Sequence, residues 1–334
     1  MSTPHVSVVI PLFQSERTIG ETLASVLAQT FADFEVIVID DGSRDRGPEI
    51  ARACGDARVR VVTQVNRGLA GARNSGIREA HGVYIALLDA DDRWHPQKLA
   101  RHVAVLDAQP AVGLTYSASR LIDDDGCDLG LSQWPSRATT RAEDVFCRNP
   151  VGNGSAPVLR RAAFDALAFW DRGLGRLCWF DESFKQSEDI ECWTRLVATT
   201  TWRCVLVPFA LTDYRVNSTG LSANTERQLA TWQRFRDKVR SYAPALAEEH
   251  GAEAEAFQMR YLARRAVKAG DGRIASKMMH EAFRLSPDII ASEPVRTLVT
   301  YAAAIACAVV PRGLVERLMT MATSTMALSA RRGA

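Results

Sequence analysis

The clearest candidate for chemistry in this sequence is a group of three carboxylates that follows a short apolar run. Residues 84–88 (YIALL) lead directly into residues 89–92 (DADD). The run has the length and composition of a strand buried on both faces. Carboxylates clustered at its end raise each other's pKa, a conflict that a divalent cation removes. Asp89 and Asp91 are therefore candidate ligands of Mg²⁺ or Mn²⁺. The alternative is a solvated acidic turn that caps the helix expected near Pro96.

A second acidic group lies at the expected start of a helix. Apolar residues recur at helical spacing over residues 190–197, and Ser187 is a candidate N-cap, which places Glu188 and Asp189 in the first turn. Acids at this position can simply complement the helix dipole, contributing about 0.3–1 kcal/mol each. The functional interpretation makes Asp189 a general base held at a rigid helix end.

An alternation of strands and helices is expected to position these groups. Ser15 is the expected N-cap of the first helix, and Pro11 is expected to end the first strand. The pattern predicts an α/β fold with a mostly parallel central sheet flanked by helices. Strands are expected at residues 6–10, 34–39, 59–62, 84–88, 112–117, 152–161 and 205–211, and helices at 15–29, 45–54, 69–80 and 97–108. Residues 123–126 are expected to form an exposed turn, residues 129–148 a loop, and residues 214–220 a further loop.

Three segments follow the carboxyl ends of expected strands: residues 11–13 (PLF) and the two acidic segments 40–43 and 89–91. Ligands of open α/β sheets bind at this edge. The sequence has neither a Gly-x-Gly-x-x-Gly after the first strand nor a Gly-x-x-x-x-Gly-Lys. We therefore expect phosphates to be met by metal and by arginine. Arg67 and Arg73 lead into a helix, although either can equally be surface charge.

Composition narrows the class of protein further. The 334 residues are 47% hydrophobic and 24% charged with a net charge of +2, which indicates a globular protein and argues against a nucleic-acid partner. Seven cysteines without close-spaced pairs suit a reducing compartment. No signal-peptide pattern begins the chain, so we expect a cytoplasmic protein.

The C-terminal third loses strand character and predicts an all-helical extension over residues 223–334. Helices are expected at residues 227–242, 252–269 and 273–285. The apolar run 298–310 is shorter than the roughly 20 residues that span a bilayer. Residues 314–326, followed by Arg331 and Arg332, have the pattern of an amphipathic surface helix. The extension is thus a candidate for peripheral contact with the inner face of the cell membrane, or for homo-oligomer formation.

Together these motifs resemble the family 2 glycosyltransferases of the GT-A fold. The resemblance covers about residues 5–220, which the family divides into a nucleotide-sugar half (about 1–95) and an acceptor half (about 96–222). The matching pieces, in the family's order, are residues 8–16, 38–43, 68–76, 88–92 with Trp94, Lys98 and Leu99, 188–189 with Trp193 and Arg195, and 214–215.

The resemblance implies an EC 2.4 enzyme, hexosyl or related. It would move a sugar from a nucleotide-diphosphate donor, UDP-sugars being favoured, to a hydroxyl of a glycan or lipid-linked acceptor. The reaction would be a metal-assisted single displacement with inversion, in polysaccharide or cell-surface glycan synthesis. Asp189 would deprotonate the acceptor hydroxyl, which helps a weak nucleophile by roughly 10²–10⁴-fold.

The resemblance also assigns the donor side of the site. Asp91 would bind the divalent metal that bridges the diphosphate, Asp89 would support the ribose or the metal shell, and Arg73 would stabilise the leaving group. Nucleoside contacts are assigned to the residues Pro11, Phe13, Glu16, Asp41 and Ala90.

Two features depart from the family's pattern. Asn217 replaces a histidine that often follows the Tyr-Arg pair, and residues 170–176 are extra sequence beside the acceptor region. Two other classes are considered. A catalytically idle nucleotide-sugar-binding or scaffold protein would not need Asp91 and Asp189, and a nucleotidyltransferase would normally carry a glycine- and lysine-rich phosphate loop.

Overall fold

The computed structural model describes residues 3–135, 139–216 and 225–309. Contacts divide the chain into two compact units. Residues 1–145 and 149–220 form the α/β unit, and residues 146–148 and 221–334 form the helical unit. Each has buried clusters of its own.

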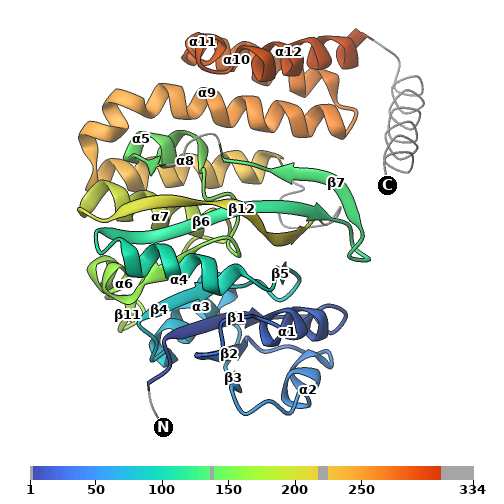
Figure 1. Ribbon diagram of the computed structural model, residues 1–334. Helices are drawn as coiled ribbons and strands as arrows, with labels where there is room; N and C mark the ends of the chain where they lie inside the picture. The colour runs from blue at the N-terminus through green and yellow to red at the C-terminus, as the bar shows by residue number, and fades with distance from the viewer. Residues whose placement is uncertain (1–2, 136–138, 217–224, 310–334) are drawn as a thin grey trace. The chain divides into compact units, whose positions relative to one another are not determined.

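The α/β unit is built on one large mixed sheet with strand order β3-β2-β1-β4-β9-β6-β12-β5 (Figure 1). Strand β7 pairs with β6 and strand β8 with β12, and β10 and β11 form a separate hairpin. The strands are Val6–Leu12 (β1), Phe34–Asp40 (β2), Val59–Thr63 (β3), Tyr84–Leu87 (β4), Arg93–Trp94 (β5), Val112–Ile122 (β6), Asp128–Gln133 (β7), Thr139–Thr140 (β8), Val158–Arg160 (β9), Phe169–Asp171 (β10), Arg176–Cys178 (β11) and Arg203–Arg215 (β12).

Parallel pairing, which the alternation of strands and helices predicts, is confirmed for β1 to β4. Strand β9 then runs antiparallel to both β4 and β6, while β12 is parallel to β6. The second half of the sheet is therefore mixed, and β9 joins it to the first half.

Helices cover both faces of this sheet, as predicted. Along β1, Val9 belongs to one buried cluster and Val8 and Ile10 to the other, because successive strand residues point to opposite faces. Ile77 of α3 packs in the first cluster, and Leu23 of α1 packs in the second. The helices of this unit are Ile19–Leu27 (α1), Gly47–Arg52 (α2), Gly68–Glu79 (α3), Lys98–Ala108 (α4), Ala142–Arg148 (α5, whose last three residues belong to the helical unit), Arg161–Leu167 (α6) and Glu188–Thr199 (α7).

Strand β1 does not end at Pro11, so that prediction is wrong. The carbonyl of Val9 accepts from Leu88 on the β4 side, and the carbonyl of Leu12 accepts from Asp41 on the β2 side. By alternation, the backbone nitrogen of Pro11 faces the β4 side, beyond the last β1–β4 pair. Because β4 has no paired residue at this position, no carbonyl of β4 loses a hydrogen-bond donor when residue 11 is proline. The strand therefore tolerates a proline there.

Three further local predictions are wrong. Helix α1 begins at Ile19 with Thr18 at its N-cap position, rather than near Ser15. The segment 129–148 is not a loop, because it contains much of β7 and the whole of β8 and α5. Tyr214 and Arg215 close strand β12 instead of starting a loop, and residue 217 lies outside the described residues. The predicted turn at residues 123–126 is confirmed between β6 and β7.

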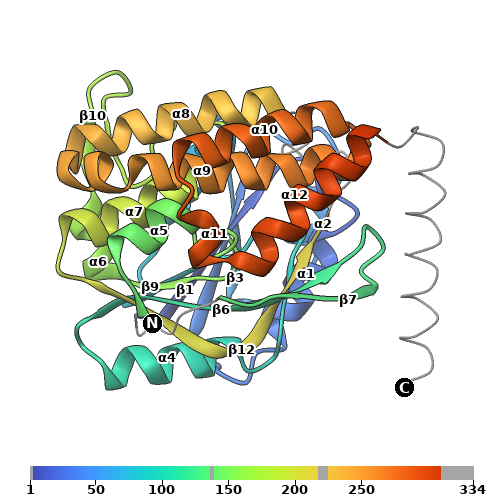
Figure 2. The same cartoon turned by 90° about the horizontal axis from the view of Figure 1, so that it is seen from above.

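Over residues 225–309, which the structure describes, the helical unit confirms the predicted all-helical extension. Figure 2 shows α9 and α10 running alongside each other, and α12 packs against α10. Its helices are Thr225–Tyr242 (α8), Pro244–Lys268 (α9), Gly272–Leu285 (α10), Ile289–Ser292 (α11) and Pro294–Val309 (α12). Among the residues described, no helix has the length and apolar character needed to cross a membrane. The amphipathic helix predicted for residues 314–326 lies outside the described residues.

Candidate active site

The acidic turn after β4 is held by helix α1. The backbone carbonyl of Ala90 accepts hydrogen bonds from the hydroxyls of Thr18 (2.8 Å) and Thr22 (2.9 Å). Thr22 also donates to the carbonyl of Asp92 at 2.8 Å. The backbone of this turn is thus fixed at its inner side, while the side chains of Asp89 and Asp91 remain partly exposed.

Asp92, the third acid of the turn, is a structural residue. Its carboxylate is fully buried and accepts hydrogen bonds from the backbone N–H of Arg215 (2.8 Å) and from the hydroxyl of Ser155. Burial raises the pKa of Asp92 well above its ordinary value, and the charges of Asp91 and Asp89 raise it further. Asp92 is therefore closed to a ligand, whereas Asp89 and Asp91 are partly exposed.

Arg73 lies at the centre of the acidic group. Helix α3 carries its side chain into the protein, where it is 2% exposed. One terminal nitrogen pairs with Asp89 Oδ1 at 2.7 Å and the other with Glu188 Oε1 at 2.7 Å. Burial alone would lower the pKa of Arg73, but Asp89 and Glu188 raise it above the ordinary value, so the guanidinium stays charged.

Glycine is required where the chain passes this guanidinium. A Cβ atom on Gly154 would lie 2.1 Å from Nη2 of Arg73 and 3.0 Å from Oδ2 of Asp89. Any side chain at this position would displace the ion pair. The close approach of the Arg73 guanidinium explains why residue 154 is glycine. Backbone conformation does not, because Gly154 does not have a positive φ.

The first turn of α7 brings its acids to the same place. Glu188 and Asp189 begin the helix, as predicted, and Ser187 occupies the N-cap position. Its side chain makes no capping hydrogen bond, because Ser187 adopts a left-handed backbone with φ of 64°. Burial raises the pKa of Glu188 to about 7 although Arg73 lowers it, and burial also raises the pKa of Asp189.

Three predicted site residues therefore come together: Arg73, Asp89 and Asp189 interact electrostatically within one cluster. Glu188 was not predicted as a site residue, yet it contributes the buried partner of Arg73. Its only signal in the sequence is its place directly before Asp189. Tyr214 belongs to a motif that the sequence analysis names, residues 214–215, but no role was assigned to it. Burial raises the pKa of its phenol, and the charges of Asp92, Asp89 and Asp91 raise it further.

On the nucleoside side, Asp41 is already engaged by the protein. Its carboxylate is 2% exposed and accepts hydrogen bonds from the backbone N–H groups of Arg67 and Gly68, each at 2.8 Å. The side chain of Gln64 donates to it at 2.6 Å. Asp41 thus fixes the loop that enters α3, and through α3 the position of Arg73.

The remaining predicted nucleoside contacts lie at and beyond the end of β1. Pro11 is buried within the strand, whereas the ring of Phe13 is 50% exposed. Glu16 is exposed and accepts a hydrogen bond from the backbone N–H of Arg46 at 3.0 Å. Ala90 contributes its backbone to the turn and is almost fully buried.

Asn74 is a further residue that sequence reasoning missed. Its side-chain oxygen accepts from the backbone N–H groups of Trp179 (3.0 Å) and Phe180 (2.8 Å), and its amide donates back to the carbonyl of Phe180 at 2.8 Å. The neighbouring residues Arg73 and Asn74 therefore tie helix α3 to the first turn of α7 and to the segment that leads into α7, respectively.

The carboxylates of the acidic turn supply only part of the ligand set that a divalent metal needs. Within the described ranges, no three His, Cys, Asp or Glu side chains are arranged to hold an ion by themselves. Mg²⁺ bound to a nucleotide needs only one or two carboxylates, since phosphate oxygens and water fill the other positions. Asp89 and Asp91 satisfy that smaller requirement.

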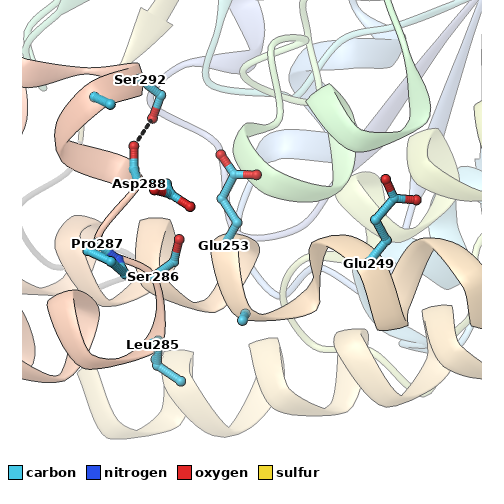
Figure 3. A pocket seen from close by; sticks show the side chains of 9 residues that line it. Glu249, Glu253, Leu285, Ser286, Pro287, Asp288 and Ser292 are labelled. Atoms are coloured by element: carbon cyan, nitrogen blue, oxygen red, sulfur yellow. Dashed lines mark hydrogen bonds between the residues drawn. The ribbon is translucent and has the colours of Figure 1, made fainter.

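A separate pocket lies in the helical unit and includes none of the predicted site residues. Figure 3 shows it between α9 and the segment joining α10 to α11. The volume of the pocket is about 660 Å³. Glu249, Glu253 and Asp288 line it together with Ser286.

Solved structures share this fold. TarS from S. aureus in complex with UDP is 16% identical and superposes with a TM-score of 0.56, covering 94% of this chain and 91% of that one. The mannosyltransferase PcManGT from Pyrobaculum calidifontis, solved with GDP-Man and Mn²⁺, is 21% identical with a TM-score of 0.58, covering 92% and 87%. The α/β unit therefore has a fold of the GT-A type.

Sequence comparison then gives the family. Residues 7–167 match the family model described as glycosyl transferase family 2, and this part of the chain belongs to that family. The uncharacterized glycosyltransferase EpsJ of Bacillus subtilis is 47% identical over 91 residues, 27% of this chain and 26% of EpsJ. The E. coli protein WfgD, a UDP-Glc:alpha-D-GlcNAc-diphosphoundecaprenol beta-1,3-glucosyltransferase, is 28% identical over 225 residues, 67% of this chain and 82% of WfgD.

Coverage of other relatives is lower. The match spans 26% of EpsJ and 44% of the uncharacterized glycosyltransferase alr2836 of Nostoc, which is 33% identical over 42% of this chain. The succinoglycan biosynthesis protein ExoO of Rhizobium meliloti is 42% identical over 109 residues, 32% of this chain and 31% of ExoO.

Proposed function

We propose that this protein transfers a sugar from a nucleotide-diphosphate donor to an acceptor hydroxyl, with inversion at the anomeric carbon. One observation carries the proposal: Arg73 joins Asp89, at the donor edge of the sheet, to Glu188, which precedes Asp189 on α7. A carboxylate suited to act as a base is thereby held close to the expected donor site.

Asp189 is the proposed base. Because burial raises its pKa, it accepts a proton more readily than an ordinary aspartate does. It would take the proton of the acceptor hydroxyl while that oxygen attacks the sugar from the face opposite the diphosphate. A single displacement of this kind needs no covalent intermediate and produces inversion.

Arg73 has a different proposed role from the one expected at first. With a side chain 2% exposed and both terminal nitrogens paired to carboxylates, it is poorly placed to contact a diphosphate directly. We propose that it positions Asp89 and the first turn of α7. It would also limit the repulsion between the acids of the cluster.

For the donor, we propose that Phe13, Glu16 and the edge formed by Pro11 and Asp41 surround the nucleoside, with the turn at Ala90 beside it. The half-exposed ring of Phe13 offers an apolar surface to a base or ribose. UDP-sugars are favoured, because WfgD is named for a UDP-Glc donor and TarS was solved with UDP.

Asp91, supported by Asp89, would hold Mg²⁺ or Mn²⁺ when the donor is bound. A metal there supplies positive charge to the oxygens of the departing diphosphate. PcManGT, which was solved with Mn²⁺, supports this proposal.

The proposed acceptor is a glycan or a lipid-linked sugar in polysaccharide or cell-surface glycan synthesis. The names of WfgD and ExoO support this class. We place the enzyme in the cytoplasm, at the inner face of the cell membrane, where such acceptors are carried. The seven free cysteines suit that compartment.

Thermal stability measured with a panel of nucleotide sugars tests donor binding, since a ligand that binds the folded state raises its stability by mass action. We expect one UDP-sugar to raise the melting temperature more with Mn²⁺ than with chelator, and Asp91→Ala to remove that difference. NMR of the product then reads the anomeric configuration. A donor that binds but is never transferred would favour the idle nucleotide-sugar-binding alternative, and retention of configuration would contradict the single displacement.

A further inference from the structure

Helix α12 places its polar and apolar side chains in the reverse of the usual order. Thr297 and Thr300 face inward and are 0% and 4% exposed, while Leu298 and Val299 are 52% and 63% exposed. A surface helix normally turns its apolar stripe to the core and its polar residues to water. The outer face of α12 therefore exposes aliphatic side chains where a surface helix normally exposes polar ones.

Hydrogen bonds fix this orientation of the helix. The hydroxyl of Thr297 donates to the carbonyl of Ile289 at 2.9 Å and accepts from the guanidinium of Arg260 at 2.6 Å. The hydroxyl of Thr300 donates to the carbonyl of Arg296 at 2.6 Å, and the fully buried Ala304 packs in the core of the helical unit. The Thr300 hydrogen bond is internal to α12, but rotating the helix to bury its aliphatic residues would break both contacts of Thr297 and remove Ala304 from the core.

The exposed aliphatic residues form one stripe along the helix. We call the exposed residues Val295, Leu298, Val299, Ile305 and Val309 the outer stripe. From residue 297 to residue 309 the sequence contains no charged side chain. Single exposed apolar residues are ordinary, but a continuous stripe marks a contact surface.

Charge indicates which partner this surface meets. Residues 294–334 contain five arginines and one glutamate, a net charge of +4, whereas the whole chain carries +2. The first 293 residues therefore carry −2, and the positive charge is concentrated in the part of the chain that bears the outer stripe. A second copy of the chain would bring two segments of +4 together, which repel each other.

We propose that the outer stripe of α12 docks on an anionic lipid surface. Aliphatic side chains would enter the boundary between head groups and acyl chains. Arg296 on α12 and the four arginines that follow it in the sequence would add positive charge that favours negative head groups. The described part of α12 has 16 residues, fewer than the roughly 20 that span a bilayer, and we propose that it lies in the interface. The proposal does not depend on the reaction that the α/β unit catalyses.

Vesicle flotation of the full-length protein tests the proposal. Vesicles of phosphatidylcholine alone are compared with vesicles that also contain phosphatidylglycerol. The test variant carries Val295→Ser, Leu298→Ser and Val299→Ser. The matched control carries Val83→Ser, Leu129→Ser and Leu131→Ser, three exposed apolar residues of the α/β unit. Melting curves of both variants confirm folding, and the single variant Leu298→Ser is used if the triple variant melts early.

We expect the unmodified protein and the control variant to float with the anionic vesicles, and added salt to weaken the binding. The α12 variant should bind at least about tenfold more weakly, because the aliphatic contribution is lost. Equal flotation of the α12 variant and the unmodified protein would overturn the proposal, as would no flotation of the unmodified protein. A dimer that light scattering detects and that the α12 substitutions dissociate would assign the stripe to a second copy instead.

Discussion

Two roles have been considered for Asp189, and one substitution distinguishes between them. Its place in the first turn of α7 would let it serve only the helix dipole, but the buried cluster around Arg73 favours a role as base. Asn has nearly the same shape as Asp and cannot accept the proton of the acceptor.

We expect Asp189→Asn to lower turnover by roughly 10²-fold or more, with donor affinity and melting temperature close to normal. The control is Asp165→Asn, at an exposed aspartate on α6, which should leave turnover, donor affinity and melting temperature unchanged. The measurements are initial rates, nucleotide titration and a melting curve. Retention of more than about a tenth of the turnover would move the base to Glu188 or to another residue.

Glu188 predicts an unusual dependence of stability on pH. Its pKa is about 7 in the folded protein against an ordinary value of 4.5, with burial as the main cause. The folded state therefore binds this proton more tightly than the unfolded chain does, and it loses stability as pH rises through the window between these two values.

The free energy of unfolding should fall by up to roughly 3 kcal/mol across that window, and Glu188→Gln should remove this fall. Denaturant titrations on both sides of the window measure it. The control is Glu49→Gln, an exposed first-turn acid of α2, which should keep the unmodified pH dependence. If the Glu188→Gln variant has the same pH dependence of unfolding as the unmodified protein, the prediction is wrong. Arg73 would then keep Glu188 ionised across the whole pH window.

At the scale of elements, helix α3 is pressed closely against strand β1. A Cβ on Gly76 would lie 2.2 Å from Cγ1 of Val9, so alanine there forces the helix away from the sheet. We expect Gly76→Ala to destabilise the protein by roughly 1–3 kcal/mol, as overpacked cores do.

Gly20→Ala in α1 is the matched comparison. The added methyl group would meet only Ile50 at an ordinary 3.7 Å, so it should stabilise the protein by about 0.5–1 kcal/mol through the better helix propensity of alanine. Denaturant unfolding of both variants checks the pair. Equal effects would mean that α3 can move from β1 at little cost.

The elements also show how far sequence patterns reach. The buried strands and amphipathic helices of residues 6–108 were predicted to within a few residues, because their apolar periodicity is local information. Strand β7 was missed because all of its residues are exposed, which leaves no alternation of buried and exposed positions to detect. The antiparallel direction of β9 depends on pairing with β4 and β6, which no local pattern encodes.

The site was predicted with the same limit. Asp89 and Asp189 were predicted as site residues because acids at a strand end and at a helix start stand out in the sequence, and the structure brings them into one cluster. The pairing of Arg73 with Glu188 was not, because the two residues are 115 positions apart and each is unremarkable alone. The engagement of Asp41 by backbone N–H groups likewise becomes visible only once the loop before α3 is in place.

At the scale of the whole molecule, the two units have separate cores. Helix α12 supplies Thr297 to the buried guanidinium of Arg260 and Ala304 to the core of the helical unit. Ending the chain after Glu293 should therefore destabilise the helical unit by roughly a few kcal/mol. Nucleotide binding by the α/β unit should remain. Calorimetry with and without UDP measures both, and loss of UDP binding in the shortened chain would contradict the independence of the two cores.

The ties that Arg73 and Asn74 make to α7 and to the segment before it also bear on the order in which the protein folds. Their partners lie 105 to 115 residues later in the chain, so each contact closes a long loop before it gains anything in return. A nascent chain that has left the ribosome only as far as the turn after β4 has Arg73 and Asp89 but no Asp189. We therefore expect a donor-binding half to appear during synthesis well before a competent base, so that an unfinished chain cannot consume the activated sugar.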